Sequence, residues 1–154
     1  MSRRNNMIVE LNTFPDSRGS LTCIDTKKWD QVNISKNLKK FTFRGMHFQN
    51  SPRQSKQIIV TKGSIIDFIY NLKTKTLEAY ALQEGEAVFV NKFSAHGFLT
   101  LEDDTVVTYL VAGKYNPKQE HSIVWKDIPH LKNIILSHCK ESELVISQKD
   151  NEGK

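Results

Sequence analysis

Short apolar segments recur along the chain at intervals of about ten residues, and turn-forming residues separate them. The clearest segment, 64–72, is rich in Ile, Phe and Tyr, which favour β-strands. Similar segments lie at 7–11, 20–25, 56–61, 77–82, 87–90, 96–101 and 105–111, with turns at 15–19, 62–63, 83–86 and 102–104. Because little helix is expected between them, this spacing predicts an all-β sandwich or barrel.

One helix is predicted near the end of the chain. Leu131, Ile134, Ile135, His138 and Cys139 stand at the spacing that places side chains on one helical face. The residues from about 148 onward are polar and are expected to form a C-terminal tail. Since the sequence contains no repeat or linker, we expect residues 1–154 to form a single domain.

Composition narrows the functional class. Of the 154 residues, 38% are hydrophobic and 25% charged, and no apolar run approaches the roughly 20 residues that span a bilayer. With no signal-peptide pattern and two cysteines that form no motif, we expect a cytoplasmic protein without a membrane partner. The net charge of +5 favours an anionic partner. Nucleic acid is not expected, because aromatic residues are not interleaved with the basic ones.

The run 44–49, Arg-Gly-Met-His-Phe-Gln, carries the most chemical information. On a regular strand, residues 44, 46 and 48 would point to one side and residues 45, 47 and 49 to the other. His47 is notable because imidazole can accept and return a proton near neutral pH. His96 lies in a second apolar segment. Two such histidines on separate strands can face one cavity and act on a small molecule.

An ordered set of short motifs resembles the nucleotide-sugar 3,5-epimerase family, the dTDP-4-dehydrorhamnose 3,5-epimerase-like proteins. The resemblance covers about residues 8 to 150. No single motif is decisive, but their order is specific. The motifs are Asp16-x-Arg18-Gly19, Arg44-Gly45-Met46-His47-Phe48-Gln49, Lys56, Lys62-Gly63, Ala95-His96-Gly97-Phe98, Tyr115-x-Pro117-x-x-Glu120, Trp125-x-Asp127 and Ser147-Gln148-Lys149-Asp150.

The resemblance implies a cupin-like double-stranded β-helix, or jelly roll, that is usually a homodimer and works without metal or other cofactors. The residues independently disfavour a metal. A metal-binding cupin usually has two closely spaced histidines, whereas His47 is followed by Phe48 and Gln49. The three or four nitrogen and oxygen ligands that a metal needs are not apparent.

The implied reaction is inversion of carbon 3, carbon 5 or both in a nucleotide-activated 4-keto-6-deoxy sugar, a step in deoxysugar and polysaccharide biosynthesis. By position, His47 matches the family's base and Asp150 the carboxylate paired with it. Tyr109 matches the proton donor, and Lys56 and His96 match groups near the ketone oxygen. A base, an acid and cationic groups at the oxygen are what an enolate intermediate requires.

The resemblance also implies the substrate-binding residues. Arg18 and Arg44 match positions that hold the nucleotide diphosphate, and a guanidinium suits phosphate because it donates paired hydrogen bonds. Gln31 and Asn33 resemble a polar strand that recognises the nucleotide or sugar. The remaining predicted substrate-binding residues are Gln49 and Tyr115.

The chain departs from the family pattern at several positions. Leu21 replaces a common aromatic residue and Cys23 a common glutamate, while Lys114 and Asn71 stand where an aromatic and an aspartate are frequent. Because of these changes, the sequence does not identify the nucleotide or the sugar of the substrate. The alternatives are a sugar 3,4-ketoisomerase, which usually carries a second histidine beside the first, a non-catalytic nucleotide-sugar-binding cupin and a nucleic-acid-binding barrel.

Overall fold

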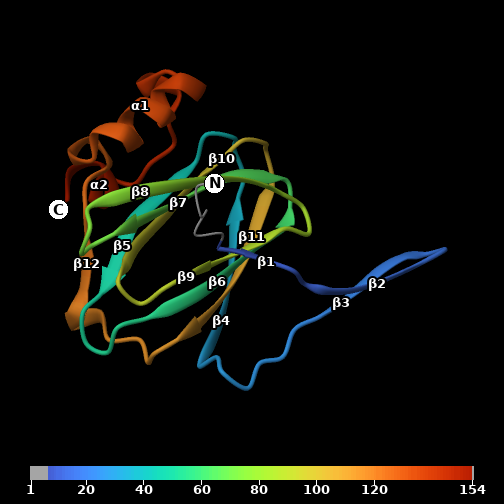
Figure 1. The fold of residues 1–154 in the computed structure, drawn as a ribbon. Coiled ribbons are helices and arrows are strands. Elements are labelled where there is room, and N and C mark those ends of the chain that lie inside the picture. Colours follow the sequence, from blue (N-terminus) through green and yellow to red (C-terminus); the bar gives the residue numbers. More distant parts are fainter. Residues whose placement is uncertain (1–6, 154) are drawn as a thin grey trace, which may run out of the picture.

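The computed structural model describes residues 7–153 and is built around two five-stranded antiparallel sheets (Figure 1). The strand order is β1-β9-β6-β11-β4 in the first sheet and β12-β5-β10-β7-β8 in the second. The first sheet contains β1 (Ile8–Val9), β4 (Gln31–Asn37), β6 (Ser55–Lys62), β9 (Ala87–Val90) and β11 (Thr105–Ala112). The second contains β5 (Phe43–Gln49), β7 (Ser64–Asn71), β8 (Thr76–Gln83), β10 (Ser94–Thr100) and β12 (Glu120–Ser122).

This arrangement confirms the predicted jelly roll. The apolar segments at 56–61, 64–72, 77–82, 87–90, 96–101 and 105–111 coincide with six strands, β6 to β11. Pattern alone did not predict β12, which is three residues long and pairs with the outer edge of β5. Strand β4 alternates polar and apolar residues and was identified only through the resemblance.

Two apolar cores make the molecule three layers deep. The first core lies between the sheets and includes Ile58, Val88, Phe98 and Val107. Side chains alternate across a strand, so each sheet directs one set of side chains into this core. Burial of these side chains is the main stabilising contribution to the sandwich.

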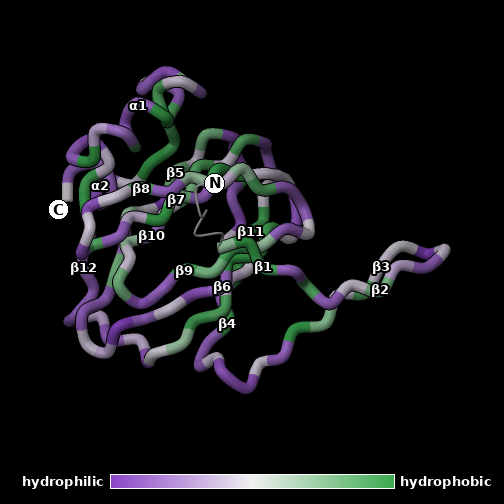
Figure 2. The backbone as a smooth tube through the Cα atoms, viewed as in Figure 1, coloured by the Kyte–Doolittle hydropathy of each residue, from purple (hydrophilic) through white to green (hydrophobic). Residues whose placement is uncertain are grey.

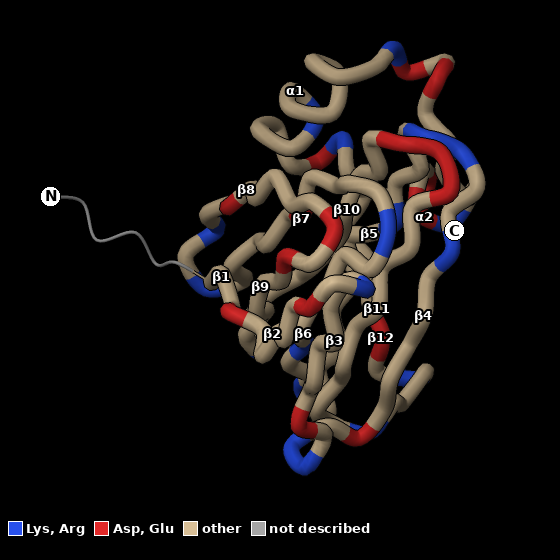
Figure 3. Tube along the Cα trace, turned by 90° about the vertical axis from the view of Figure 1, so that its right-hand side faces the viewer, with Lys and Arg blue, Asp and Glu red and all other residues tan. Residues whose placement is uncertain are grey.

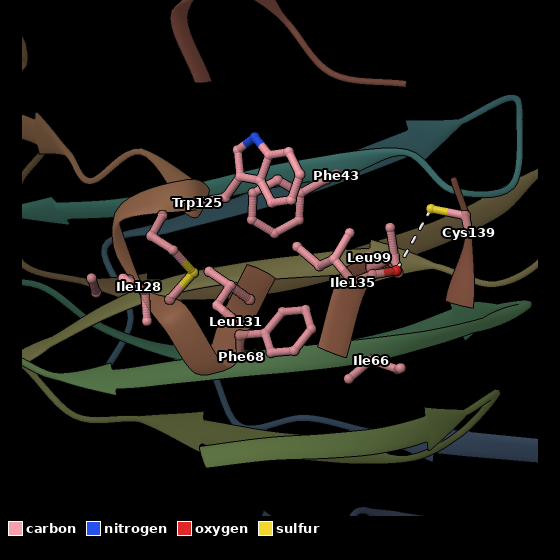
Figure 4. Close-up of a cluster of buried hydrophobic side chains, with 11 residues drawn as sticks. Phe43, Ile66, Phe68, Leu99, Trp125, Ile128, Leu131, Ile135 and Cys139 are labelled. Carbon is pink, nitrogen blue, oxygen red and sulfur yellow. Dashed lines mark hydrogen bonds between the residues drawn. The ribbon is translucent and has the colours of Figure 1, made fainter. Parts of the chain in front are cut away.

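The second core lies between the outer face of the second sheet and the helical C-terminal region (Figure 4). Phe43, Met46 and Phe68 contribute from the sheet. The helical side consists of the short helix η2 (Trp125–Asp127) and helix α1 (Pro129–His138), which buries Leu131 and Ile135. The predicted helix therefore exists, and its apolar face covers the sheet.

The expected polar tail is folded. Residues 148–152 form helix α2 (Gln148–Glu152), which packs against β5 and is preceded by the short helix η3 (Glu141–Glu143). Ser147 caps α2 by accepting a hydrogen bond from the Asp150 amide at 3.1 Å. Composition alone does not reveal this helix, because its buried residue Asp150 is held by a partner in β5.

A hairpin of β2 (Asn12–Asp16) and β3 (Gly19–Cys23) projects from the sandwich (Figure 1). Hydrophilic residues lie at its tip, whereas apolar ones occur along its arms (Figure 2). Phe14 and Leu21 are register partners and are 59% and 64% exposed. The hairpin thus presents an uncovered apolar pair away from either core.

Basic and acidic residues are interspersed over the trace in the view of Figure 3. The net charge of +5 is therefore not concentrated in one basic stripe along this face. Within residues 7–153, no helix is both long enough and apolar enough to cross a membrane.

Candidate active site

A cavity of about 510 Å³ is lined by side chains from β4, β6 and β11 of the first sheet and from β5 and β12 of the second, together with adjoining loops. Its volume is in the range that holds a small-molecule ligand. Its lining is largely polar and combines cationic, hydroxyl and amide side chains. The lining residues are Gln31, Asn33, Ile34, Ser35, Lys36, Arg44, His47, Gln54, Lys56, Tyr109, Val111, Tyr115 and Glu120.

A bulge in β5 brings Arg44 and His47 to the same cavity. The register with β10 shifts between the pairs His47–His96 and Arg44–Phe98, so β5 contains one extra residue there. Regular alternation would place Arg44 on the opposite face from His47, and that expectation was wrong. Met46 instead enters the second core with no exposed surface.

His47 and Asp150 form the hydrogen-bonded pair that the resemblance implied. The atoms His47 Nε2 and Asp150 Oδ1 are 2.6 Å apart, and the two side chains are 30% and 8% exposed. Asp150 Oδ2 accepts a second hydrogen bond from the Gly45 amide at 3.2 Å. With Nε2–H donating to the carboxylate, Nδ1 is the basic atom of the imidazole.

The charge state of Asp150 suits this role. Burial by itself raises the pKa of the carboxyl, but the hydrogen bond and charge of His47, with the Gly45 amide, hold the pKa below 3.8. Asp150 is therefore ionised at neutral pH. An ionised partner fixes the histidine tautomer and stabilises the imidazolium that forms when His47 takes a proton.

Lys56 and Tyr109 come from neighbouring strands and line the same cavity. Lys56 Nζ lies 5.9 Å from the centre of the Tyr109 ring. Burial lowers the pKa of Lys56, while the charges of Glu120 and Asp67 oppose that change. Burial also raises the pKa of Tyr109, so its phenol stays protonated at neutral pH. The cavity therefore contains an uncharged proton donor close to the amine of Lys56.

His96 is not among the residues that line the cavity. It is 7% exposed, and its Nε2 is 2.6 Å from Oδ1 of the fully buried Asp67. Burial raises the pKa of Asp67, and the charges of His96 and Lys56 oppose this. The predicted contact of His96 with a ketone oxygen is not evident in the cavity lining. The structure instead joins His96, Asp67 and Lys56 in one buried electrostatic group.

The predicted substrate-binding residues divide into two groups. Arg44, Gln31, Asn33 and Tyr115 line the cavity. Arg44 Nε donates to Asn37 Oδ1 at 2.7 Å, which fixes its guanidinium at the cavity wall.

Gln49 and Arg18 are not among the residues that line the cavity of one chain, so their substrate contacts stay predictions. Gln49 is 3% exposed, donates to the carbonyls of Pro52 and Lys114 and accepts from the Asn116 amide. Through these three hydrogen bonds Gln49 joins β5 to the loops at 52 and at 114–116. Arg18 lies in the turn between β2 and β3, its guanidinium is 2.6 Å from Asp16 and 88% exposed, and it does not line the cavity of its own chain.

Glu120 belongs to one of the motifs that resemble the family, but the sequence alone predicts no role for it. Glu120 is the single carboxylate among the lining residues, and its Oε2 accepts a hydrogen bond from the Tyr115 hydroxyl at 3.0 Å. Its charge acts on both Lys56 and Tyr109. Gln54 was also missed; its amide donates to the Gly113 carbonyl. No residue spacing in the sequence predicts either position, because Gln54 lies in a loop and Glu120 lies on the edge strand β12.

This arrangement provides the components of proton transfer at a carbon beside a ketone. In this geometry the imidazole of His47 can serve as a base supported by an ionised carboxylate, the phenol of Tyr109 as a neutral acid, and the side chain of Lys56 as a cation for a developing oxyanion. Within residues 7–153, no group of three or more His, Cys, Asp or Glu side chains is placed to hold a metal ion.

Comparisons with known proteins point to the same chemistry. A protein of Sinorhizobium fredii described as a dTDP-4-dehydrorhamnose 3,5-epimerase is 28% identical, over 94% of this chain and 81% of the relative. A dTDP-4-dehydrorhamnose 3-epimerase of Streptomyces niveus is 28% identical over 60% of this chain and 48% of its own length. Among solved structures, a dTDP-4-dehydrorhamnose 3,5-epimerase from Bacillus anthracis with TDP and PPi bound superposes with a TM-score of 0.80 and 29% identity, covering 94% of this chain and 90% of that one.

The family model described as dTDP-4-dehydrorhamnose 3,5-epimerase matches residues 4–154, which is nearly the whole chain. The same residues contain the two-sheet fold and the cavity with its histidine–carboxylate pair. The chain therefore belongs to the dTDP-4-dehydrorhamnose 3,5-epimerase family of isomerases.

Proposed function

We propose that this protein is an epimerase that inverts carbon 3, carbon 5 or both in a nucleotide-activated 4-keto-6-deoxy sugar. The observation that carries the proposal is the hydrogen-bonded pair of His47 and Asp150 in a cavity that also contains Tyr109 and Lys56. The family membership supports the same reaction. The substrate is a dianionic diphosphate ester, which suits the cationic side chains of the lining.

The reaction begins when His47 removes the proton from a carbon next to the ketone. The electron pair of the C–H bond moves into the carbonyl group, and the resulting enolate oxygen is stabilised by the Lys56 ammonium. Asp150 stabilises the imidazolium. Tyr109 then donates its proton to the opposite face of the carbon, which restores the ketone with inverted configuration. Solvent returns a proton to Tyr109 and accepts the one on His47.

Incubation with dTDP-4-keto-6-deoxyglucose in D₂O tests this proposal. We expect deuterium to enter at carbon 3, carbon 5 or both, and proton and carbon NMR measure this incorporation. The His47→Ala variant should not incorporate deuterium. Deuterium at carbon 3 alone would indicate inversion of one centre, as the name of the Streptomyces niveus relative describes for that protein. A product whose ketone has moved to carbon 3 would identify a 3,4-ketoisomerase instead. Absence of exchange with every nucleotide keto sugar tried would reject an enzymatic role.

The proposal includes a homodimer. The exposed pair Phe14 and Leu21 on the projecting hairpin lacks a cover in one chain, and the edge strand β4 exposes Val32 and Ile34 by 51% and 65%. Apolar surface and an open sheet edge are both features that a second copy of the chain would cover. Arg18 lies away from its own cavity, so a contact with the diphosphate would be made in the cavity of the partner.

We also propose a cytoplasmic location. Both cysteines are free: Cys23 is exposed and Cys139 is buried, so neither participates in a disulfide. Free cysteines suit a reducing compartment. Fractionation of the producing cells, with enzyme activity measured in each fraction, tests this location.

A further inference from the structure

Helix α2 holds Asp150 at the active site, yet it has almost no apolar attachment of its own. It is five residues long, and Asp150 is its single buried residue. A helix this short does not persist alone, because nucleation costs more than so few hydrogen bonds return. Its position against β5 must therefore depend on specific polar contacts.

Two contacts involve Asp150 itself and one involves the next residue. The Asp150 carboxylate binds His47 and the Gly45 amide, as described above. Asn151 Oδ1 accepts a hydrogen bond from the indole Nε1–H of Trp125 at 3.0 Å. This bond links α2 to η2, 26 residues earlier in the chain.

Trp125 is a firm attachment point. Its side chain has no exposed surface and packs in the second core, where Figure 4 shows the indole nitrogen at the outer edge of the cluster. Indole nitrogen is a donor only, and within the described structure its acceptor is Asn151. Successive residues of a helix are separated by a fixed rotation of about 100° and a rise of 1.5 Å. Fixing Asn151 to Trp125 therefore also fixes the direction of the Asp150 carboxylate.

We propose that Asn151 is a positioning residue for the epimerase reaction, which acts by locking α2 to Trp125 and so holding Asp150 against His47. This inference rests on the proposed function for its kinetic consequence, but its structural part stands independently. Asn151 does not touch the cavity, since it is absent from the lining. Its effect on the reaction passes through Asp150 alone.

The central experiment compares Asn151→Ala with the wild type in steady-state kinetics and in amide hydrogen exchange. We expect kcat to fall about 10- to 100-fold with KM changed less than about threefold, because a displaced base partner affects the chemical step more than binding. Amide exchange in residues 147–153 and at Gly45 should become faster. A second substitution, Trp125→Phe, removes the donor while keeping an aromatic ring in the core, and should produce the same exchange pattern.

Two comparisons separate positioning from a general structural effect. In the background of Asp150→Asn, adding Asn151→Ala should cause no further loss of kcat, since both act through one carboxylate. Asn151→Asp keeps an oxygen acceptor of the same shape and should restore most of the exchange protection. Glu152→Ala is the matched control on the same helix, because the Glu152 side chain is exposed and contacts Gln148 only at the surface.

The outcomes decide between the two proposals. Unchanged kcat and unchanged exchange in Asn151→Ala would overturn the positioning role, as would a loss of kcat that adds fully to that of Asp150→Asn. If Asn151→Ala does not fold, the exchange of Trp125→Phe decides instead. If the wild type turns over no nucleotide keto sugar, the proposed function fails, whereas the exchange data still confirm or reject the link between α2 and Trp125.

Discussion

At the scale of single residues, the site depends on charges that are kept in the required state by their surroundings. Asp150 is ionised although mostly buried, because it accepts hydrogen bonds from His47 and from the Gly45 amide. Tyr109 is protonated because burial disfavours its phenolate. The carboxylate beside His47 is thus charged while the phenol of Tyr109 is neutral, which suits the proposed transfer of a proton across a substrate.

The first prediction concerns Asp150→Asn. We expect kcat to fall about 10²–10⁴-fold, because an amide cannot stabilise the imidazolium and can favour the wrong histidine tautomer. Steady-state kinetics with the keto sugar measure this effect, and circular dichroism checks that the fold is kept. If the variant retains the wild-type kcat, the pair of His47 and Asp150 does not take part in the rate-limiting proton transfer.

The second prediction concerns stability against pH at the same residue. The folded-state pKa of Asp150 lies below its ordinary value of 3.8, so ionised Asp150 stabilises the fold at pH values above 3.8. That contribution is lost as pH falls through the lower, folded-state value. The difference in unfolding free energy between wild type and Asp150→Asn should therefore be largest near neutral pH and shrink below pH 3.8. Denaturant titrations at several pH values measure it, and a difference that grows on acidification would contradict the assignment.

The third prediction concerns Lys56→Met. Removing the ammonium should lower kcat about 10²–10³-fold through loss of oxyanion stabilisation. Because burial lowers the pKa of Lys56 from 10.5, its charged form carries a folding cost at neutral pH, and the variant should unfold at an equal or higher temperature. The wild-type rate should also decline on the alkaline side before pH 10.5 is reached. A variant that is both active and less stable would show that Lys56 serves the fold instead.

At the scale of elements, the β5 bulge determines which side chains reach the cavity. Gly45 lies in it with φ of +133°, and a Cβ there would come within 2.6 Å of Gly97 Cα and 2.8 Å of the His96 carbonyl oxygen. The close approach of β5 and β10 therefore requires glycine at 45. Through it, one strand presents Arg44 and His47 to the cavity and Met46 to the second core.

The fourth prediction follows from that contact. Gly45→Ala should destabilise the protein by about 2–4 kcal/mol, since the methyl group meets rigid backbone and the positive φ is strained. Gly85→Ala is the matched control: its φ is +87°, but a Cβ there has no neighbour within 4 Å. It should cost only about 1–2 kcal/mol. Equal unfolding free energies for the two variants, measured by denaturant titration, would show that the β5–β10 contact imposes no extra constraint.

At the scale of the whole molecule, one chain leaves surface that its fold does not cover. The hairpin carries Phe14 and Leu21 on one face, and the hydroxyls of Thr13 and Thr22 meet at 2.9 Å as register partners. Side chains alternate across a strand, so these two pairs lie on opposite faces of the hairpin. The apolar face is the part that a partner chain would bury.

The fifth prediction tests this surface. Phe14→Asp should convert the proposed dimer to a monomer, because burying a carboxylate in the interface is unfavourable when no cation or hydrogen-bond donor faces it. Thr22→Asp, on the polar face, should leave the assembly unchanged. Light scattering after size-exclusion chromatography measures the mass of each variant. A wild type that is monomeric at all concentrations would refute the dimer, and a dimeric Phe14→Asp would place the interface elsewhere.

The strands β6 to β11 could be predicted from sequence because their apolar residues and turns are local signals. The helix at 148–152 could not be predicted from the local pattern, although the motif order implied the pair of Asp150 and His47. Residues 148–152 are polar and resemble a tail by composition, yet they form a helix because Asp150 meets His47 and Asn151 meets Trp125, more than 20 residues away in the chain. Composition reports what a segment prefers alone, whereas these contacts exist only after the sheets have formed.

The amino-acid sequence by itself determined the all-β class and, through ordered motifs, the family, and it predicted which side chains would form the site. Only the tertiary structure decided how these side chains are arranged. A bulge brings Arg44 to the same cavity as His47, and Gln49 is hydrogen-bonded to backbone groups of loops. His96 is hydrogen-bonded outside the cavity lining, and Arg18 lies on the hairpin, outside the cavity of its own chain. The physical reason is that hydrophobic period and motif order are properties of neighbours along the chain. Register shifts, buried hydrogen bonds and charge pairing depend on residues that meet through folding.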